Sequence, residues 1–145
     1  MKEKLLISAC LTGENCKYNG GNNYIAAVER LKERYELISV CPEQDGGLST
    51  PRESSERLGD KVVSKSGNDV TAQFTRGAQH ALDVALKYGC KCALLKERSP
   101  SCGSGAIYDG SFTGTVISGD GVTAELLKAH GITVYGESDI DELMR

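Results

Sequence analysis

The chain has 145 residues, a length typical of one domain and sufficient for a hydrophobic core without disulfide or metal cross-links. It carries 17 Lys and Arg against 20 Asp and Glu, a net charge of −3, and its 39% apolar composition is that of an ordinary globular domain. A weakly acidic chain has no strong positive field, which argues against duplex nucleic acid as a partner. Its apolar runs are far shorter than the ~18 residues that a membrane span needs, so no membrane association is expected.

Six cysteines are the unusual feature of the composition. In a small secreted domain they would indicate a disulfide framework. Residues 1–10 contain lysines and a small residue before a cysteine, but their apolar segment is shorter than the ~7 residues that a signal peptide needs. We therefore interpret this segment as a strand and expect a cytoplasmic protein. Its thiols are then reduced and available for metal binding or catalysis.

In chain order, the pattern first predicts a buried strand at 5–9, a Gly-rich loop at 11–23, a helix at 24–34 begun by Asn22 or Asn23, a strand at 37–40 and an irregular segment at 42–59. The second half of the sequence first predicts a short strand at 61–65, the longest helix at 70–88 capped by Asp69, a strand at 92–96 and a loop at 98–105. A hairpin of 106–108 and 114–117, a helix at 122–130, a strand at 132–135 and a helical turn at 140–144 are predicted to follow. Short apolar strands that alternate with helices predict an α/β fold. We expect one compact domain over residues 1–145, with a mainly parallel sheet, helices on both faces and a small hairpin.

Three cysteines follow three of the predicted strands. Cys10 and Cys41 close the first two strands, and Cys102 lies on the loop that leaves the strand at 92–96. Ligands of parallel sheets bind beyond the carboxyl ends of the strands, so these thiols are predicted to meet at one edge. The alternative is that they are unrelated cysteines at strand ends.

The other three cysteines have different expected places. Cys90 and Cys92 enter a strand at its opposite end, where a buried free cysteine is usually a small hydrophobe. Cys16 lies in the loop after Cys10, and its role stays open between a fourth ligand, a spare thiol and a sulfur acceptor.

Three sulfurs without a fourth suit a metal centre with an open position, and thiolates select zinc, copper(I) or iron–sulfur clusters. Glu43 and Ser101, a carboxylate and a hydroxyl, stand next to Cys41 and Cys102 and have the chemistry to move protons. The sequence does not decide whether Ser99 or Ser101 would relay the proton. His80 and His130 fall on helices away from the predicted edge, which disfavours Cys–His and Ser–His hydrolase mechanisms.

Several motifs together resemble one known family. They are residues 10–20 (CLTGENCKYNG), 41–52 (CPEQDGGLSTPR), 69–71 (DVT), Gly77-Ala78, 96–103 (KERSPSCG), 108–110 (YDG) and 119–124 (GDGVTA). In order and content they are similar to the family of short domains whose characterised members are iron–sulfur-dependent 2-thiouracil desulfidases. Asn19 stands where that family usually has an aspartate, and Ser54-Ser55 replaces a stretch that usually contains proline.

The resemblance implies a 4Fe–4S cluster held by Cys10, Cys41 and Cys102, with one open iron that binds the sulfur of a small thiolated nucleobase. It implies that Glu43 and Ser101 are catalytic, that the products are uracil and sulfide, and that the acceptor of the sulfide is still to be identified. An exposed cluster would be largely lost from protein prepared in air. A zinc- or sulfur-binding module without catalysis is the alternative function. A thiol redox enzyme acting through Cys10 and Cys16 is disfavoured because the chain has no Cys-x-x-Cys pair.

Overall fold

A four-stranded parallel sheet forms the centre of the computed structural model, which describes residues 2–145. The strands lie in the order β2-β1-β5-β8, and every neighbouring pair is parallel. Their bounds are β1 Glu3–Ser8, β2 Tyr35–Val40, β5 Cys92–Leu95 and β8 Thr133–Gly136. The two central strands are apolar because both faces of the sheet are covered, which explains why Leu5, Leu6 and Ile7 are fully buried. The four predicted core strands are confirmed.

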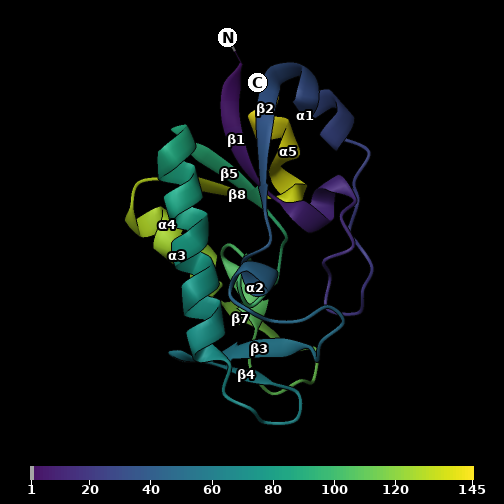
Figure 1. Cartoon of the computed structure of the whole chain (residues 1–145), viewed down its shortest axis with the longest axis vertical. Helices are drawn as coiled ribbons and strands as arrows, with labels where there is room; N and C mark the ends of the chain where they lie inside the picture. The colour runs from purple at the N-terminus through teal and green to yellow at the C-terminus, as the bar shows by residue number, and fades with distance from the viewer. Residues whose placement is uncertain (1) are drawn as a thin grey trace.

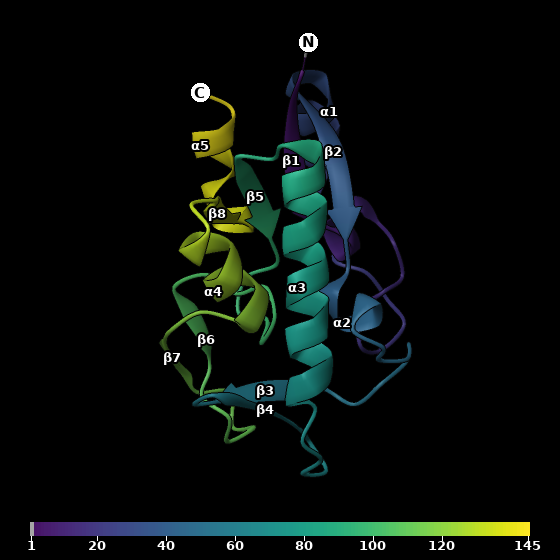
Figure 2. The same ribbon diagram turned by 60° about the vertical axis from the view of Figure 1, so that its left-hand side comes forward.

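Helices cover both faces of this sheet, as Figures 1 and 2 show. One apolar cluster joins the sheet to α3 (Thr71–Tyr88) and α4 (Val122–Ala129). A second cluster joins the opposite face to α1 (Val28–Arg34) and α5 (Ile140–Leu143). The chain is therefore a single α/β domain with the predicted layers.

The longest helix, α3, packs through the stripe predicted from its apolar spacing. The buried side chains of this stripe are Val70, Phe74, Ala78, Ala81, Leu82 and Ala85. Asp69 Oδ1 accepts a hydrogen bond from the Thr71 N–H at 2.9 Å, next to the N-cap residue Val70. At the other end Gly89 has a φ of 70°, a left-handed conformation that glycine adopts without steric cost and that ends the helix.

Three predicted segments differ from the structure: the helix at 24–34, the strand at 5–9 and the irregular segment at 42–59. The first helix begins only at Val28, after Ala27, and neither Asn22 nor Asn23 caps it. Asn22 Oδ1 instead accepts the Tyr24 N–H at 3.0 Å, a local turn that competes with helix formation. The first strand ends at Ser8, and a short 3₁₀ helix, η1 (Ala9–Thr12), follows it.

The segment at 42–59 is more regular than predicted. It contains α2 (Pro42–Asp45) and β3 (Ser55–Leu58), which pairs antiparallel with β4 (Lys61–Ser64). A four-residue helix and a polar strand have too few residues to show an apolar period, so tertiary contacts decide their structure. The predicted hairpin is confirmed as β6 (Ala106–Tyr108) and β7 (Val116–Ser118), whose second strand begins two residues later than predicted. A second 3₁₀ helix, η2 (Glu137–Asp139), precedes α5.

The site-bearing edge of the sheet lies at the carboxyl ends of its strands. After β1 the chain adds β2 on one side and later β5 on the other, so the order reverses beside β1. Such a reversal leaves a crevice beyond the strand ends, where ligands of open α/β sheets bind. In Figure 1, α2 and the small hairpins lie beyond this edge. No helix in the described part of the chain is long and apolar enough to cross a membrane.

Two glycines allow α2 to touch the backbone of α3. A Cβ atom at Gly77 would lie 1.8 Å from the Pro42 carbonyl oxygen, and one at Gly46 would lie 1.9 Å from that of Gln73. The Arg76 guanidinium also donates to the Gly46 carbonyl at 2.8 Å. These contacts fix α2, and with it the residues that directly follow β2, against the longest helix.

Replacing Gly77 by Ala tests this contact. In open space the change would stabilise a helix by about 1 kcal/mol. Here we expect a net loss of about 1–3 kcal/mol in the free energy of unfolding, because the methyl group collides with the Pro42 carbonyl. Urea unfolding measures it, with Thr75→Ala on the exposed face of α3 as a control that changes stability by less than about 0.5 kcal/mol. An increase in stability for Gly77→Ala would show that α2 does not press on α3.

Candidate active site

A cavity of about 840 Å³ opens at the carboxyl edge of the sheet. Its walls come from the segments that follow β1, β2 and β5 and from the hairpin strands β3 and β6. Its volume falls within the range of small-molecule sites. Cys10, Cys41, Cys102 and Glu43 all line it, together with Cys16. The predicted convergence of three distant cysteines on one site is confirmed.

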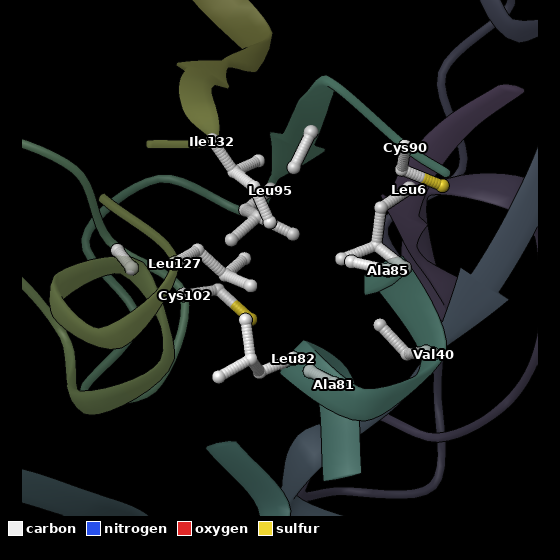
Figure 3. Close-up of a cluster of buried hydrophobic side chains, with 12 residues drawn as sticks. Leu6, Val40, Ala81, Leu82, Ala85, Cys90, Leu95, Cys102, Leu127 and Ile132 are labelled. Carbon is white, nitrogen blue, oxygen red and sulfur yellow. The ribbon is translucent and has the colours of Figure 1, made fainter. Parts of the chain in front are cut away.

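Local structure explains where each of these three thiols lies. Cys10 follows β1 in the 3₁₀ helix η1, which ends at Gly13 with a φ of 100°. Cys41 is the N-cap residue of α2, and Pro42 occupies the first helical position, where its missing N–H costs nothing. Cys102 lies in the loop after β5, and its side chain belongs to the apolar cluster shown in Figure 3.

The loop that carries Cys102 is held by the amino terminus of α4. The first-turn N–H groups of Val122 and Thr123 donate to the carbonyls of Pro100 and Ser101 at 2.9 and 2.8 Å. These N–H groups have no partner inside their own helix, so the loop serves as their cap. The helix therefore fixes the backbone next to Cys102.

Cys16 lies between Cys10 and Cys41. It is 4% exposed, and its thiol lies close enough to both neighbours to lower their pKa values. The Cys41 thiol also donates to the Cys16 carbonyl oxygen at 3.8 Å. Four thiols thus face the cavity, and the sequence had left the place of this fourth thiol open.

Hydrogen bonds and burial shift the pKa values of these thiols in opposite directions. The hydrogen bond with Cys16 lowers the pKa of Cys10 to about 7, against the effect of burial, and lowers the pKa of Cys41 as well. The same bonds, with Cys10 first, raise the pKa of Cys16. Burial in the apolar cluster raises the pKa of Cys102 to about 12. Of the three strand-end thiols, Cys102 therefore holds its proton most firmly, because its pKa is raised while those of Cys10 and Cys41 are lowered.

The three strand-end thiols that line the cavity are the kind of ligand that an iron–sulfur cluster takes. Within residues 2–145, no three His, Cys, Asp or Glu side chains lie close enough together to hold one metal ion. A structural zinc site would need its sulfurs about 2.3 Å from one common point. An iron–sulfur cluster takes each cysteine on a different iron, so its ligands surround a wider space, and thiolates are its usual ligands. Cys10, Cys41 and Cys102 line one cavity and come from three separate segments of the chain.

Glu43 brings a carboxylate to the same cavity. It is the second residue of α2, and its side chain is 18% exposed. Its Oε1 accepts a hydrogen bond from Arg52 Nε at 3.0 Å. Burial raises the pKa of Glu43, and the charge of Arg52 opposes that shift. The predicted position of Glu43 at the site is confirmed, and its chemical role stays a prediction.

The two serines of the loop after β5 differ from the expectation. Ser101 was expected to line the cavity, but it is fully buried and absent from the lining. Its hydroxyl is 2.7 Å from that of Thr123, because the cap contact turns this side chain toward α4. Ser99 does line the cavity, and its oxygen accepts the N–H groups of Ser101 and Cys102 at 3.1 and 3.0 Å.

Several residues of the cavity wall were not found by sequence reasoning. Arg52 is almost buried, and Lys96 forms an ion pair of 3.0 Å with Glu137. Asn23 lines the cavity and lowers the pKa of Cys10, and Glu56 accepts backbone N–H groups from the loop between β6 and β7. Arg52 and Lys96 lie inside the motifs described above, but a charged residue in a loop shows no period that distinguishes a site wall from a solvated surface.

The remaining candidates lie outside the site, as expected. Cys90 and Cys92 are at the other end of β5 and do not line the cavity. In Figure 3, Cys90 and Cys102 stand at opposite sides of one apolar cluster. His80 lies 3.6 Å from Asp45 on the exposed side of α3, and His130 follows α4. Neither histidine reaches a cavity thiol or hydroxyl, so within residues 2–145 the site has no Cys–His or Ser–His pair.

Comparison with known proteins gives three matches. The sequence model of the 2-thiouracil desulfurase family matches residues 5–139. The solved structure of the 4Fe–4S-dependent thiouracil desulfidase TudS is 48% identical in sequence and superposes with a TM-score of 0.94, over 99% of this chain and 96% of that one. The uncharacterised protein YbbK of Bacillus subtilis (strain 168) is 40% identical over 150 residues, which cover 97% of this chain and 99% of YbbK.

The buried position of Ser101 predicts a measurable contribution to stability. Ser101→Ala leaves the Thr123 hydroxyl buried without its partner, and we expect a loss of about 1–3 kcal/mol in the free energy of unfolding. In the double variant Ser101→Ala/Thr123→Val neither hydroxyl of this pair remains, so part of the loss should be recovered. Urea unfolding of the metal-free proteins measures both. Equal stability of the wild type and Ser101→Ala would show that the two hydroxyls are not paired.

Proposed function

This chain is a member of the 2-thiouracil desulfurase family, and on that premise we propose that it removes sulfur from a thiolated pyrimidine such as 2-thiouracil by hydrolysis. The overall reaction replaces the C=S group by C=O and consumes one water for each hydrogen sulfide released. The observation that carries the proposal is the meeting of Cys10, Cys41 and Cys102 with Glu43 in one cavity at the switch point of the sheet.

We propose that these three cysteines hold a 4Fe–4S cluster, the group named for the homologue TudS. When bound, such a cluster supplies an open iron that acts as a Lewis acid toward the thiocarbonyl sulfur. The apolar surroundings of Cys102 anchor one thiol in a rigid core, and Asn23 and Cys16 support Cys10 through hydrogen bonds. Neighbours that orient ligand side chains in this way are a general feature of metal sites.

Glu43 is proposed to take the proton of the attacking water. Its Oε1 is held by Arg52, whereas its Oε2 has no hydrogen-bond partner within residues 2–145. The carboxylate lines the cavity, so this free oxygen is available to a water molecule beside the substrate. A water held there would lose its proton to Glu43 as it attacks the carbon of the C=S group.

We propose that Ser99, rather than Ser101, delivers a proton to the leaving group. Both acceptor positions of the Ser99 hydroxyl are used by backbone N–H groups, so its own proton is free to point toward the cavity. Ser101, which the family resemblance favours as the catalytic serine, is buried outside the cavity lining, and its hydroxyl pairs with that of Thr123. Its proposed role is to support the segment that carries Cys102, through its buried contact with Thr123.

Cysteine variants test the proposed ligands. After anaerobic reconstitution, Cys10→Ala, Cys41→Ala and Cys102→Ala should each lose the iron and the broad absorbance near 400 nm, while circular dichroism shows an intact fold. The wild type should hold about four irons per chain. Cys90→Ala and Cys92→Ala are matched controls that keep the iron and cost about 1 kcal/mol of stability each. One tightly bound zinc in place of iron would instead support the binding module without catalysis.

Sulfide release from 2-thiouracil tests the reaction itself. Reconstituted wild type should release sulfide and form uracil, and Glu43→Gln and Ser99→Ala should each lower kcat by about 100-fold while iron is retained. Ser101→Ala should lower kcat far less than Ser99→Ala. The reverse order would restore Ser101 as the proton relay, and absence of sulfide from several thiolated bases would contradict the proposed function.

A further inference from the structure

We propose that Arg52 is a positioning residue of this reaction, which holds the Glu43 carboxylate and the backbone of Cys16 in one fixed arrangement. The inference rests on the proposed role of Glu43. It concerns a residue whose side-chain donors bind protein acceptors and which acts on the substrate only through Glu43.

The contacts of the Arg52 guanidinium join three separate segments. Nε donates to Glu43 Oε1 at 3.0 Å, and one terminal nitrogen donates to the Cys16 carbonyl at 2.9 Å. The other terminal nitrogen donates to the Ser49 carbonyl at 3.2 Å and the Thr50 hydroxyl at 2.9 Å. The side chain is only 8% exposed, so these acceptors replace water around its charge.

The backbone of Arg52 adds a further tie to the same loop. Its N–H donates to the Tyr18 carbonyl at 2.7 Å, two residues beyond Cys16. The Cys16 carbonyl in turn accepts both the Arg52 guanidinium and the Cys41 thiol. Arg52 therefore sets the distance between the wall of the cavity that carries Glu43 and the wall that carries Cys16.

The ion pair also selects which carboxylate oxygen is free. Because Oε1 is engaged by Arg52, Glu43 presents Oε2 for proton transfer without a search among rotamers. Removal of the guanidinium would leave a mostly buried carboxylate without its counter-charge and free to turn away from the water. Misplacement of a catalytic group by about 1 Å can cost about 100-fold in rate.

Lysine cannot reproduce this arrangement. The guanidinium is a rigid planar fork that reaches acceptors in several directions, whereas an ammonium group is a single point of charge. In the Arg52→Lys variant the ammonium could stay near Glu43 or reach the Cys16 carbonyl, but it could not hold all three segments together. We therefore expect Arg52→Lys to fall between the wild type and Arg52→Gln.

A kinetic double-mutant cycle tests the proposal with the reconstituted protein and 2-thiouracil. Arg52→Gln should lower kcat by about 100-fold and change KM by less than about threefold. In the Glu43→Gln background the same change should lower kcat by less than about threefold, because Arg52 then has no base to position. Iron content and absorbance near 400 nm should stay unchanged, since no proposed ligand side chain is removed. Equal losses in the two backgrounds, or loss of iron from Arg52→Gln, would overturn the proposal.

Arg57→Gln is the matched control. Arg57 is also mostly buried and also combines a carboxylate, Glu125 at 2.7 Å, with backbone carbonyls, but it does not line the cavity. It should lower stability and leave kcat within about twofold of the wild type. A loss of kcat as large as that of Arg52→Gln would show that any disrupted buried arginine has this effect. If Arg52→Gln does not fold, Arg52→Lys carries the same comparison.

Urea unfolding of the metal-free proteins separates this inference from the proposed function, because it needs no turnover. Arg52→Gln leaves the charge of Glu43 unpaired, so its unfolding midpoint should be lower than that of the double variant Glu43→Gln/Arg52→Gln. A double variant less stable than Arg52→Gln would show that Arg52 does not hold the carboxylate. A third outcome is that the wild type releases no sulfide while the double variant is more stable than Arg52→Gln. The proposed function then fails. The Arg52–Glu43 pair is in that case only structural, which overturns its role in the reaction.

Discussion

Parallel pairing of β1 with both β2 and β5 is the constraint on which the site depends. Parallel strands end at the same edge, so the residues that follow these three strands must meet there, whatever their separation along the chain. Cys10, Cys41 and Cys102 are the residues that this rule brings together. The apolar clusters on the two faces keep the strands in register and so keep the three cysteines at fixed relative positions.

Protein–protein contacts hold the backbone around the cavity. Glycine at positions 46 and 77 lets α2 lie directly on α3, which fixes the segment that carries Cys41 and Glu43. The amino terminus of α4 is capped by the loop that carries Cys102. These contacts belong to a chain that is long enough to fold around its own hydrophobic core.

The thiols of the cavity lie in two different electrostatic environments. Cys10 and Cys41 receive hydrogen bonds that stabilise thiolates, whereas Cys102 sits among apolar side chains that favour the neutral thiol. A metal that binds all three must displace the proton of Cys102, because only the deprotonated thiol is a ligand. The charge of Arg52 lowers the pKa of Cys41, and the charge of its partner Glu43 opposes that effect.

The sequence by itself determined the strands of the sheet and the apolar stripe of α3, because the spacing of apolar residues can be read along the chain. The alternation of strands and helices predicted a parallel sheet, and so the edge at which Cys10, Cys41 and Cys102 meet. Only the tertiary structure decided the rest. The helix α2 and the strand β3 form through contacts with distant segments, which leave no period in so few residues. Tertiary packing likewise turned Ser101 toward Thr123 and left Ser99 at the cavity, since a side chain's direction in a loop depends on which neighbour accepts its hydrogen bond.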